Sequence, residues 1–483
     1  MKVSHENVVL KSPALKCLGQ FVRQRQKEQQ TEEFTPDLEA FEVELHEHIM
    51  AVEQEMIAEE LRRYDVATEE IEVEGQVYVR GIQSPETYYS AAGPVKVERH
   101  LYQPEGGGKC ICPLELRAGI VGGLFTPRAA RQATYVMAHL TSREAVGLFG
   151  EIGNMQPSRS TLDRLPKEIS AHWEAKRESW EKALRDHESV PIEATVLAVS
   201  LDGVMAPMRD AGRKQKRSQT DKQPKGPAGY REVGCGTVSS YDDEGHRLDT
   251  IRYGRMPEHK KIALCQQLEA EVQSVLAVRH DLKLVKLADG AKDNWRFLSN
   301  LELGLAQNLE AQVEQVEIVD FFHAAEHLKA ACDAIWNRDK VKSKAKFVCL
   351  RTLLKEHKEG VEKVIRTLKY HASRAKKNRK IRTIEQLTYF RNNRHRMQYA
   401  DHLERGLPIG SGVVEAACKT LVTQRMKQSG MAWGHSGGQA ILTVRSLIQS
   451  KRWPEAWKLL HADFCKIVKV PNMASSHSLP LVA

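Results

Sequence analysis

The stretch Thr195–Val204, which reads Thr-Val-Leu-Ala-Val-Ser-Leu-Asp-Gly-Val, limits the possible folds of this chain more than any other segment. Its apolar residues Val196–Val199 have the length of a strand and leave no polar face, which is typical of a strand buried on both sides. Because a charge inside such a strand is costly, we expect the carboxylate of Asp202 at the strand end, before a turn at Gly203. Considered alone, an Asp-Gly pair after a strand indicates only a turn.

Further strands follow, and two of them also run into an acidic residue. The apolar runs predict four more strands, at 232–240, 248–253, 282–287 and 316–319. Asp289 and Gly290 follow the fourth strand, and Asp320-Phe-Phe-His323 follows the fifth. With helices between the later strands, the order is βββαβαβα and acids follow the first and fourth strands. This order predicts an α/β fold with an RNase H-like core and a mixed five-stranded sheet.

Residues 324–405 are predicted to form an all-helical insertion in this core. Between His371 and Arg382 the insertion carries six Lys or Arg residues and no acid. A basic run without opposite charge favours contact with phosphate over the ordinary alternative of a solvated helix face. We therefore expect DNA contacts from Arg374, Lys376, Lys377, Arg379, Lys380 and Arg382.

Glu415 is a third acid in a comparable setting, at the start of a helix that follows a Gly-Ser-Gly loop. Together with Asp202 and Asp289, it would supply the hard oxygen ligands that suit Mg²⁺ or Mn²⁺. Two such ions roughly 3.5–4 Å apart can hold the attacking and leaving oxygens of an in-line phosphoryl transfer. Basic side chains farther along the same helix are also expected to contact DNA: Lys419, Arg425 and Lys427.

The first 70 residues differ from the rest in charge. Residues 1–30 are basic and expected to be poorly ordered, and a helix is predicted from Thr35-Pro36 onward. Between Thr31 and Glu70 there are fourteen acidic residues and only two arginines, so this helix should contact protein rather than DNA. Homodimerisation and packing on the next domain are both open. The apolar positions recur at heptad-like steps: Leu38, Phe41, Leu45, Ile49, Val52 and Met56.

The next two regions separate into a strand-rich part and a helical part. Residues 71–126 predict a small β element, and its Cys110-x-Cys112 pair lacks the second pair that a zinc ribbon needs, which leaves zinc binding open. Residues 127–189 predict helices, with a capping box at Thr141-Ser-Arg-Glu144 and another helix start at Ser160. They fit a helix-turn-helix that would place Arg159 and Arg164 on DNA, and they fit any αα-hairpin equally well.

Several of these motifs together resemble bacterial insertion-sequence DDE transposases of the ISKra type, relatives of the Mutator-like elements, over roughly residues 70–460. The resemblance rests on Ser-Leu-Asp202-Gly, Leu-Ala-Asp289-Gly-Ala with Trp295, Asp320-Phe-Phe-His323-Ala-x-Glu-His-Leu, Pro-Ile-Gly-Ser-Gly-Val-Val-Glu415-Ala-Ala-Cys-Lys and Ser429-Gly-Met-Ala-Trp433.

The resemblance implies an RNase H-like core with a helical insertion before the glutamate, in which Asp202, Asp289 and Glu415 catalyse the reaction. It implies that Asp320 and His323 organise the site or contact DNA. By the same comparison, Trp433 or Trp295 would stack on an unpaired base, although core packing is the commoner role of a tryptophan. The activity implied is DNA cleavage at insertion-sequence ends and strand transfer into a target, with two Mg²⁺ or Mn²⁺ ions.

These inferences divide the chain into seven parts with expected roles. They are an acidic helical part at 1–70, a small β element at 71–126, a helical DNA-binding part at 127–189, the first part of the core at 190–323, the insertion at 324–405, the last part of the core at 406–470 and a disordered tail at 471–483. The expected partners are double-stranded DNA, from the terminal repeats and the target, and further copies of the chain in a homodimer or larger homo-oligomer.

Two other functions fit parts of the sequence. His323-x-x-Glu326-His327 also spells the inverted zinc-protease motif, in which the histidines would bind Zn²⁺ and the glutamate would act as base. That interpretation leaves Asp202, Asp289 and Glu415 without a role. A DNA-binding regulator derived from a transposase, without catalysis, is the second alternative.

Charge and cysteine usage bound the setting of the protein. The chain of 483 residues has a formal net charge of +9, which favours a nucleic-acid partner. Its nine cysteines include no Cys-x-x-Cys pair, as expected for reduced thiols inside a cell. No apolar signal segment and no run of about 18 apolar residues is present, so we expect a cytoplasmic, nucleoid-associated protein without membrane contact.

Overall fold

The computed structural model describes residues 12–28, 37–152, 155–209, 229–336 and 338–470. The chain divides into two compact units, one of Met1–Ala175 with Glu455–Ala483 and one of Lys176–Pro454. The expected tail, 471–483, lies outside the described residues. No helix in the described part of the chain combines the length and the apolar character that crossing a bilayer requires.

The first unit contains the small β element that the sequence predicts, as an antiparallel sheet in the order β3-β2-β1-β9. The strands are β1 (Glu70–Val73), β2 (Gln76–Ser90), β3 (Gly93–Pro104) and β9 (Val468–Lys469). Glu74 and Gly75 both have positive φ (51° and 84°) between β1 and β2. Two left-handed residues form the tight turn whose twist matches a hairpin, so β1 and β2 pair directly.

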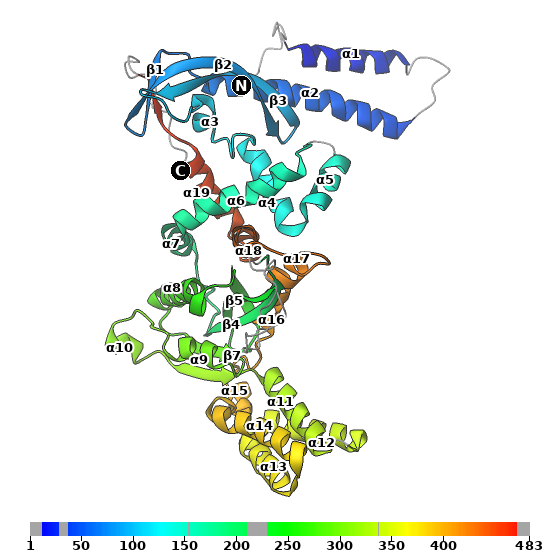
Figure 1. The fold of residues 1–483 in the computed structure, drawn as a ribbon, viewed down its shortest axis with the longest axis vertical. Helices are drawn as coiled ribbons and strands as arrows, with labels where there is room; N and C mark the ends of the chain where they lie inside the picture. The colour runs from blue at the N-terminus through cyan, green and yellow to red at the C-terminus, as the bar shows by residue number, and fades with distance from the viewer. Residues whose placement is uncertain (1–11, 29–36, 153–154, 210–228, 337, 471–483) are drawn as a thin grey trace, which may run out of the picture. The chain divides into compact units, whose positions relative to one another are not determined.

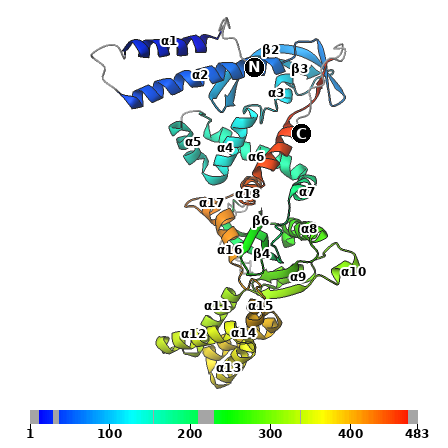
Figure 2. The same ribbon diagram turned by 180° about the vertical axis from the view of Figure 1, so that it is seen from behind.

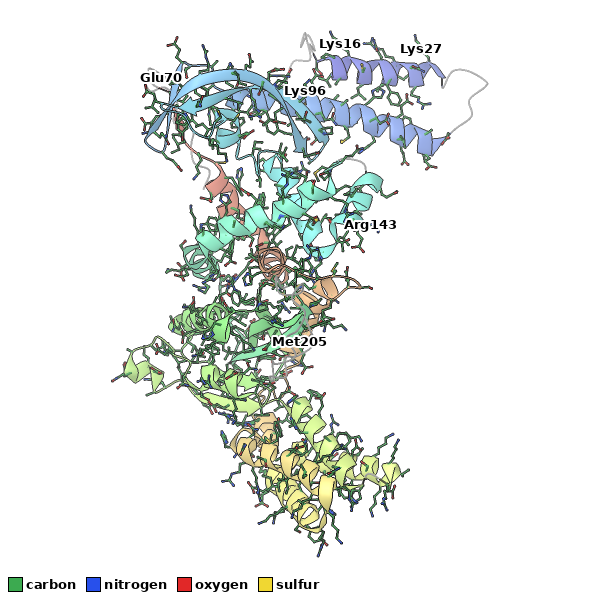
Figure 3. All side chains as sticks on the ribbon, viewed as in Figure 1. Lys16, Lys27, Glu70, Lys96, Arg143 and Met205 are labelled. Atoms are coloured by element: carbon green, nitrogen blue, oxygen red, sulfur yellow. The ribbon has the colours of Figure 1, made fainter. Side chains whose placement is uncertain are left out.

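The N-terminal prediction of poor order over residues 1–30 is wrong for Pro13–Glu28, which forms α1 (Figure 3). This helix lies against α2 (Leu38–Tyr64), and the rings of Phe21 and Phe41 stack with centroids 5.9 Å apart. Arg25 pairs with Glu44 at 3.0 Å. A basic helix is therefore ordered by its acidic neighbour, a contact between separate segments that local sequence does not reveal.

The expected apolar seam of α2 is only partly covered in the described structure. Leu38 is 69% exposed, Ile49 43% and Met56 61%. The helix begins after Asp37, whose side chain accepts a hydrogen bond from the Ala40 amide. Homodimerisation through the exposed positions stays a prediction.

Three further helices of the first unit lie in the region expected to be helical: α4 (Pro127–His139), α5 (Ser142–Glu151) and α6 (Arg159–Ala175). A short helix, α3 (Pro113–Ala118), lies instead within the region expected to be a β element. The capping box at Thr141 and Glu144 is present. At α6, however, Ser158 rather than Ser160 accepts the hydrogen bond from the Thr161 amide. Cys110 is exposed and Cys112 is buried.

The second unit is a mixed α/β structure, as predicted, with a five-stranded mixed sheet in the order β6-β5-β4-β7-β8. Its strands are β4 (Val196–Pro207), β5 (Tyr230–Tyr241), β6 (Arg247–Arg255), β7 (Lys283–Ala288) and β8 (Gln315–Val319). β4, β5 and β6 pair antiparallel, whereas β7 and β8 run parallel to β4. The first residues of β4 are buried throughout, as the apolar run implies.

β4 is longer than predicted, because it continues past Asp202 to Pro207 and the expected turn at Gly203 is absent. The antiparallel ladder with β5 runs along the whole strand and pairs Asp202 with Cys235. The parallel ladder with β7 stops at Ser200 and Leu287. Asp202 is therefore paired with β5 but lies two residues beyond the last pair between β4 and β7.

Helices cover both faces of this sheet (Figures 1 and 2). α8 (Ile262–Val278), preceded by η2 (His259–Lys261), packs on one face. The other face is covered by α16 (Gly412–Ala417), the π-helical segment η4 (Cys418–Thr423) and α18 (His435–Gln449). The other helices of the unit outside the insertion are α7 (Arg177–His187), α9 (Lys292–Ser299), α10 (Gln307–Glu310) and α17 (Gln424–Met426), and α19 (Trp453–Phe464) begins at its end.

Between β8 and α16, where the sequence predicts an insertion, the chain is helical and its helices gather in one group (Figure 1). They are α11 (Phe321–Ile335), α12 (Lys340–Glu356), α13 (Gly360–Arg374), α14 (Lys377–Asn393), η3 (Arg394–Arg396) and α15 (Tyr399–Glu404). Buried residues of α11, α13 and α14 belong to the same apolar core as those of β4 and β7. The helical group and the sheet therefore share one core.

A buried ionic network ties the end of the second unit together. Arg452 donates to Glu271 at 2.7 Å and to Glu188 at 2.7 Å, and it also donates to the Tyr253 hydroxyl at 2.8 Å. The side chains of Arg452 and Glu271 are each only 3% exposed. Removing Arg452 from this network would leave Glu271 as a buried charge without its cation.

We predict that Arg452→Met lowers the free energy of unfolding by about 3–5 kcal/mol, because Glu271 is left buried and unpaired. Urea unfolding of the purified protein measures this loss. The matched control is Lys451→Met, since Lys451 pairs with Asp249 at the surface and is 81% exposed. That change should stay within about 1 kcal/mol. Equal losses for the two variants would contradict the buried network.

Candidate active site

Asp202 and Asp289 lie just beyond the parallel ladder of β4 and β7, at the same end of that ladder. The last parallel pair of β4 and β7 is Ser200 with Leu287, and each aspartate comes two residues later. Equal offsets from a paired position keep the two residues at the same level. Burial raises the pKa of Asp202, and the nearby Asp289 carboxylate raises it further. The structure therefore brings these two acids together.

Asp289 is fixed against β4 by several hydrogen bonds. Its Oδ1 accepts from the Ala291 amide at 3.1 Å and from Asn294 Nδ2 at 3.0 Å. Asn294 Nδ2 also donates to the carbonyl of Leu201 at 3.3 Å. Trp295 is 5% exposed, and its indole N–H donates to the Asp289 carbonyl at 2.6 Å. Trp295 is thus a packing and anchoring residue here, which disfavours the stacking role.

Asp202 is half-buried and contacts a thiol from a distant segment. Its Oδ1 accepts from the Gly203 amide at 2.7 Å, and Oδ2 accepts from the Cys418 thiol at 3.6 Å. A hydrogen bond with Cys235 and burial raise the pKa of Cys418, so this thiol keeps its proton and can donate. Cys418 thereby connects the helix that follows Glu415 to the strand that carries Asp202.

Lys261 places a positive charge near Asp202. Its Nζ lies 2.7 Å from Glu232 Oε1 and donates to Asn294 Oδ1 at 3.2 Å. Attraction to this ammonium partly counters the rise in the pKa of Asp202. Lys260 and Lys261 both adopt positive φ (52° and 54°), a conformation that residues with a Cβ rarely take. Such local strain is common next to functional groups.

Glu415 lies in the first turn of α16 and is exposed. Its Oε1 accepts from the Ser411 hydroxyl at 3.0 Å. Within the described residues no hydrogen bond joins Glu415 to Asp202 or Asp289. Cys418, one turn later, does contact Asp202. The structure therefore brings the glutamate's helix to the aspartate pair but does not place the three carboxylates in contact.

Asp320 is completely buried and is used as a latch. Its side chain caps α11 by accepting from the His323 amide, and its other oxygen accepts from the Ser411 amide. Both oxygens are therefore engaged by backbone donors. These two contacts fasten the start of the helical insertion to the loop that precedes Glu415, and the role implied for Asp320 stays a prediction. The His323 side chain is 38% exposed and lies 3.6 Å from Glu326.

The alternative zinc motif is occupied by other contacts. His327 Nδ1 lies 2.6 Å from Gln386 Oε1, and the His327 ring stacks on Tyr389 with centroids 3.6 Å apart. Across the described ranges there is no group of three or more His, Cys, Asp or Glu side chains that could hold a metal ion. Zinc at this motif, zinc at Cys110 and Cys112, and magnesium at the acid triad all stay predictions.

The basic run of the insertion lies at the end of α13 and in α14. Arg374 covers the Tyr370 ring at 3.7 Å, and Lys377 is the first residue of α14. Five of the six residues have exposed side chains: Arg374, Lys376, Arg379, Lys380 and Arg382. None of these five forms an ion pair within the described residues. The expected phosphate contacts are therefore sterically possible.

The basic residues after Glu415 differ among themselves. Lys419 and Lys427 are exposed, as expected for DNA contacts. Arg425 is only 3% exposed and lies over the Trp433 ring at 5.1 Å, so its prediction as a surface contact is wrong. Trp433 is itself held by its indole N–H, which donates to the Met426 carbonyl at 3.0 Å. The apolar stripe of this helix turns Arg425 inward with it.

The two arginines predicted on a helix-turn-helix lie at the start of α6. Arg159 and Arg164 are both exposed. Arg164 Nε donates to the Ser160 carbonyl at 3.3 Å, one turn earlier. Their contact with DNA stays a prediction.

Sequence reasoning missed three residues that shape this site, namely Asn294, Cys418 and Lys261. Asn294 follows Asp289 by five positions on the next helix, and Cys418 follows Glu415 by three. Residues three or four apart share a helix face, so the spacing of Cys418 was a usable signal. Lys261 comes from the start of α8 and carries no local signal.

Comparisons with known proteins add little. No family model matches the chain. No curated protein matches it either. Among solved structures, it is similar to a chain described as "Drosophila P element transposase strand transfer complex", with a TM-score of 0.25 and 11% sequence identity over 71% of this chain and 81% of that chain. A likeness at this TM-score carries no argument, and the function proposed for this chain rests on its own residues.

We predict that Asp202→Asn is more stable than the wild type at pH 7 when a chelator is present. A folded-state pKa above the usual 3.8 means that the folded protein favours the protonated acid. The stability that comes from this preference is fully present below the unfolded-state pKa of Asp202. It is lost as the pH rises through the folded-state pKa. The gain from asparagine should therefore shrink as pH falls toward 4, as thermal unfolding from pH 8 downward would measure.

The control for this pH dependence is Asp281→Asn, at the other end of β7. The hydrogen bond from Arg279 lowers the pKa of Asp281, so the charged form is favoured in the folded state. The pKa shift of Asp281 is opposite in sign to that of Asp202, so Asp281→Asn should be less stable than the wild type at pH 7. A loss of stability in both variants would show that burial does not disfavour the charged form of Asp202.

Proposed function

We propose that this protein is a DDE-type transposase that cleaves DNA at insertion-sequence ends and joins these ends to target DNA. The observation that carries the proposal is that Asp202 and Asp289 lie near each other, at the same end of the parallel ladder of β4 and β7. Half-buried carboxylates at close quarters repel each other, and a divalent cation is the partner that relieves this cost. Carboxylate oxygens are also the ligands that Mg²⁺ and Mn²⁺ prefer, so the donor set fits these ions.

The strand order supports an RNase H-like core. Numbered along the chain, the strands of the sheet lie in the order 3-2-1-4-5, and only the second runs antiparallel to the first. This arrangement agrees with the βββαβαβα order expected from the sequence. It sets the first acid on the central strand and the second on its parallel neighbour.

Each residue of the site has a distinct task in the proposed reaction. Asp202 and Asp289 would bind the cations, and Glu415 would complete the ligand set when DNA is bound. Two bound cations would supply the activation of a water molecule or a 3′-hydroxyl and the stabilisation of the leaving oxygen. Asn294 orients the Asp289 carboxylate, and the Cys418 thiol orients that of Asp202.

The surroundings of the acids support a nucleic-acid substrate. Asp320 holds the loop before Glu415 against the start of the helical insertion. The same insertion presents the exposed basic run between Arg374 and Arg382. Phosphate binding by such a run would be strong and dependent on salt.

We predict that Asp202→Asn, Asp289→Asn and Glu415→Gln each reduce cleavage by at least about a hundredfold, which is more than the loss of an outer-shell partner usually costs. The assay follows Mg²⁺-dependent cleavage of a labelled duplex that carries the flanks of the encoding gene. DNA binding should persist in all three variants. Asp281→Asn, an exposed acid at the opposite end of β7, is the control and should cleave normally. Any one of the three that retains cleavage is not a catalytic residue.

We also predict that replacing Arg379, Lys380 and Arg382 with glutamine weakens DNA binding and flattens its salt dependence. The slope of log K against log salt should fall by about 0.9 for each phosphate that these side chains no longer neutralise. The control is Lys358→Gln, because Lys358 already pairs with Glu404 at 3.0 Å. Titrations at several salt concentrations measure both. An unchanged slope in the triple variant would show that these basic side chains form an ordinary solvated surface and do not contact phosphate.

A further inference from the structure

Tyr389 of α14 reaches from the helical insertion to the residue beside Asp289. A Cβ on Gly290 would lie 2.4 Å from Cε2 of the Tyr389 ring, so the ring fills the space that a side chain at 290 would need. On its other side the ring stacks on His327, with centroids 3.6 Å apart and planes 17° apart. The ring is therefore held between α11 and the end of β7.

The hydroxyl of Tyr389 is unusual because it is buried and has no hydrogen-bond partner among the described residues. Buried hydroxyl groups almost always have a partner, since an unmet donor carries the full cost of leaving water. Burial raises the pKa of Tyr389, and the carboxylates of Asp289, Asp320 and Glu326 raise it further. The phenol therefore keeps its proton and is a hydrogen-bond donor whose surroundings are acidic.

Asp289 has an oxygen to offer this donor. Its Oδ1 already accepts from the Ala291 amide and from Asn294. Its Oδ2 accepts no hydrogen bond from any residue that the structure describes. A carboxylate oxygen has two lone pairs, so Oδ2 can bind a cation and accept a hydrogen bond at the same time. Carboxylates that bind metals are usually hydrogen-bonded by a second residue in this way.

We propose that Tyr389 is a positioning residue for Asp289: its hydroxyl donates a hydrogen bond to Oδ2 of Asp289 when a divalent cation is bound. This inference rests on the proposed function, because it needs a cation at the acid pair. It gives the helical insertion a second task besides DNA contact: one of its side chains sets the orientation of a ligand that belongs to the sheet. A buried hydroxyl without a partner lowers stability, and a role beside a metal ligand accounts for its presence at this position.

The test compares Tyr389→Phe with Tyr399→Phe in the full-length protein. Tyr389→Phe keeps the ring, its stacking on His327 and its contact with Gly290, and removes only the unmet hydroxyl. Tyr399 is also buried, but its hydroxyl donates to the Val319 carbonyl at 2.9 Å. Mn²⁺ affinity is measured by calorimetry, and the thermal midpoint is measured in a chelator.

We expect Tyr389→Phe to weaken Mn²⁺ binding by about tenfold or more, in the range seen for outer-shell partners of metal ligands. Its thermal midpoint in chelator should be equal to or higher than that of the wild type, because no hydrogen bond is removed. Tyr399→Phe should show the reverse, with a lower midpoint and unchanged Mn²⁺ affinity. A purely structural tyrosine would not separate the two measurements.

Unchanged Mn²⁺ affinity in Tyr389→Phe would overturn the inference, as would a wild type that binds no Mn²⁺ at all. A wild type that binds Mn²⁺ without cleaving DNA would overturn the proposed nuclease and leave the comparison of affinities valid. Weaker Mn²⁺ binding with an intact thermal midpoint supports the positioning role in either case.

Discussion

The pairing of β4 with two different neighbours is the constraint on which the rest of the second unit depends. The antiparallel ladder with β5 continues to Pro207, while the parallel ladder with β7 ends at Ser200. Beyond Ser200, β4 remains paired with β5 but is no longer paired with β7. Asp202 lies in this part of β4. Because its backbone is held in the ladder with β5 rather than in a loop, its carboxylate projects from a fixed position.

Two polar contacts attach distant segments to this part of the sheet. The buried carboxylate of Asp320 holds the Ser411 amide, and the Cys418 thiol meets Asp202. Between these two contacts lies Glu415, on a short α-helix that becomes π-helical at Cys418. π-Helical turns are rare and often mark functional sites. The glutamate is thus carried by a segment that is fastened at both ends.

The sequence was sufficient for the strands and helices of the second unit, because their apolar runs are long and their order is distinctive. It was insufficient where a partner comes from far away. The apolar run of β4 does not show that β5 pairs beyond Asp202. The basic residues of Pro13–Glu28 do not show their contact with α2, and the charge of Arg425 does not show that its helix places it over Trp433. The matching strand ends of β4 and β7 predict that Asp202 and Asp289 lie near each other, whereas no sequence pattern links Tyr389 or Lys261 to these acids.

The glycines next to the acids have a consequence for the natural variation of this protein. Gly203 and Gly290 each follow an acid of the site, and each is small because a side chain from another segment fills the space: Glu232 at the first and Tyr389 at the second. Phe322 does the same at Gly410. Relatives that carry alanine or serine at one of these positions must therefore carry a smaller or displaced side chain at its counterpart. Across an alignment, these three pairs should covary even though each glycine by itself resembles an ordinary loop residue.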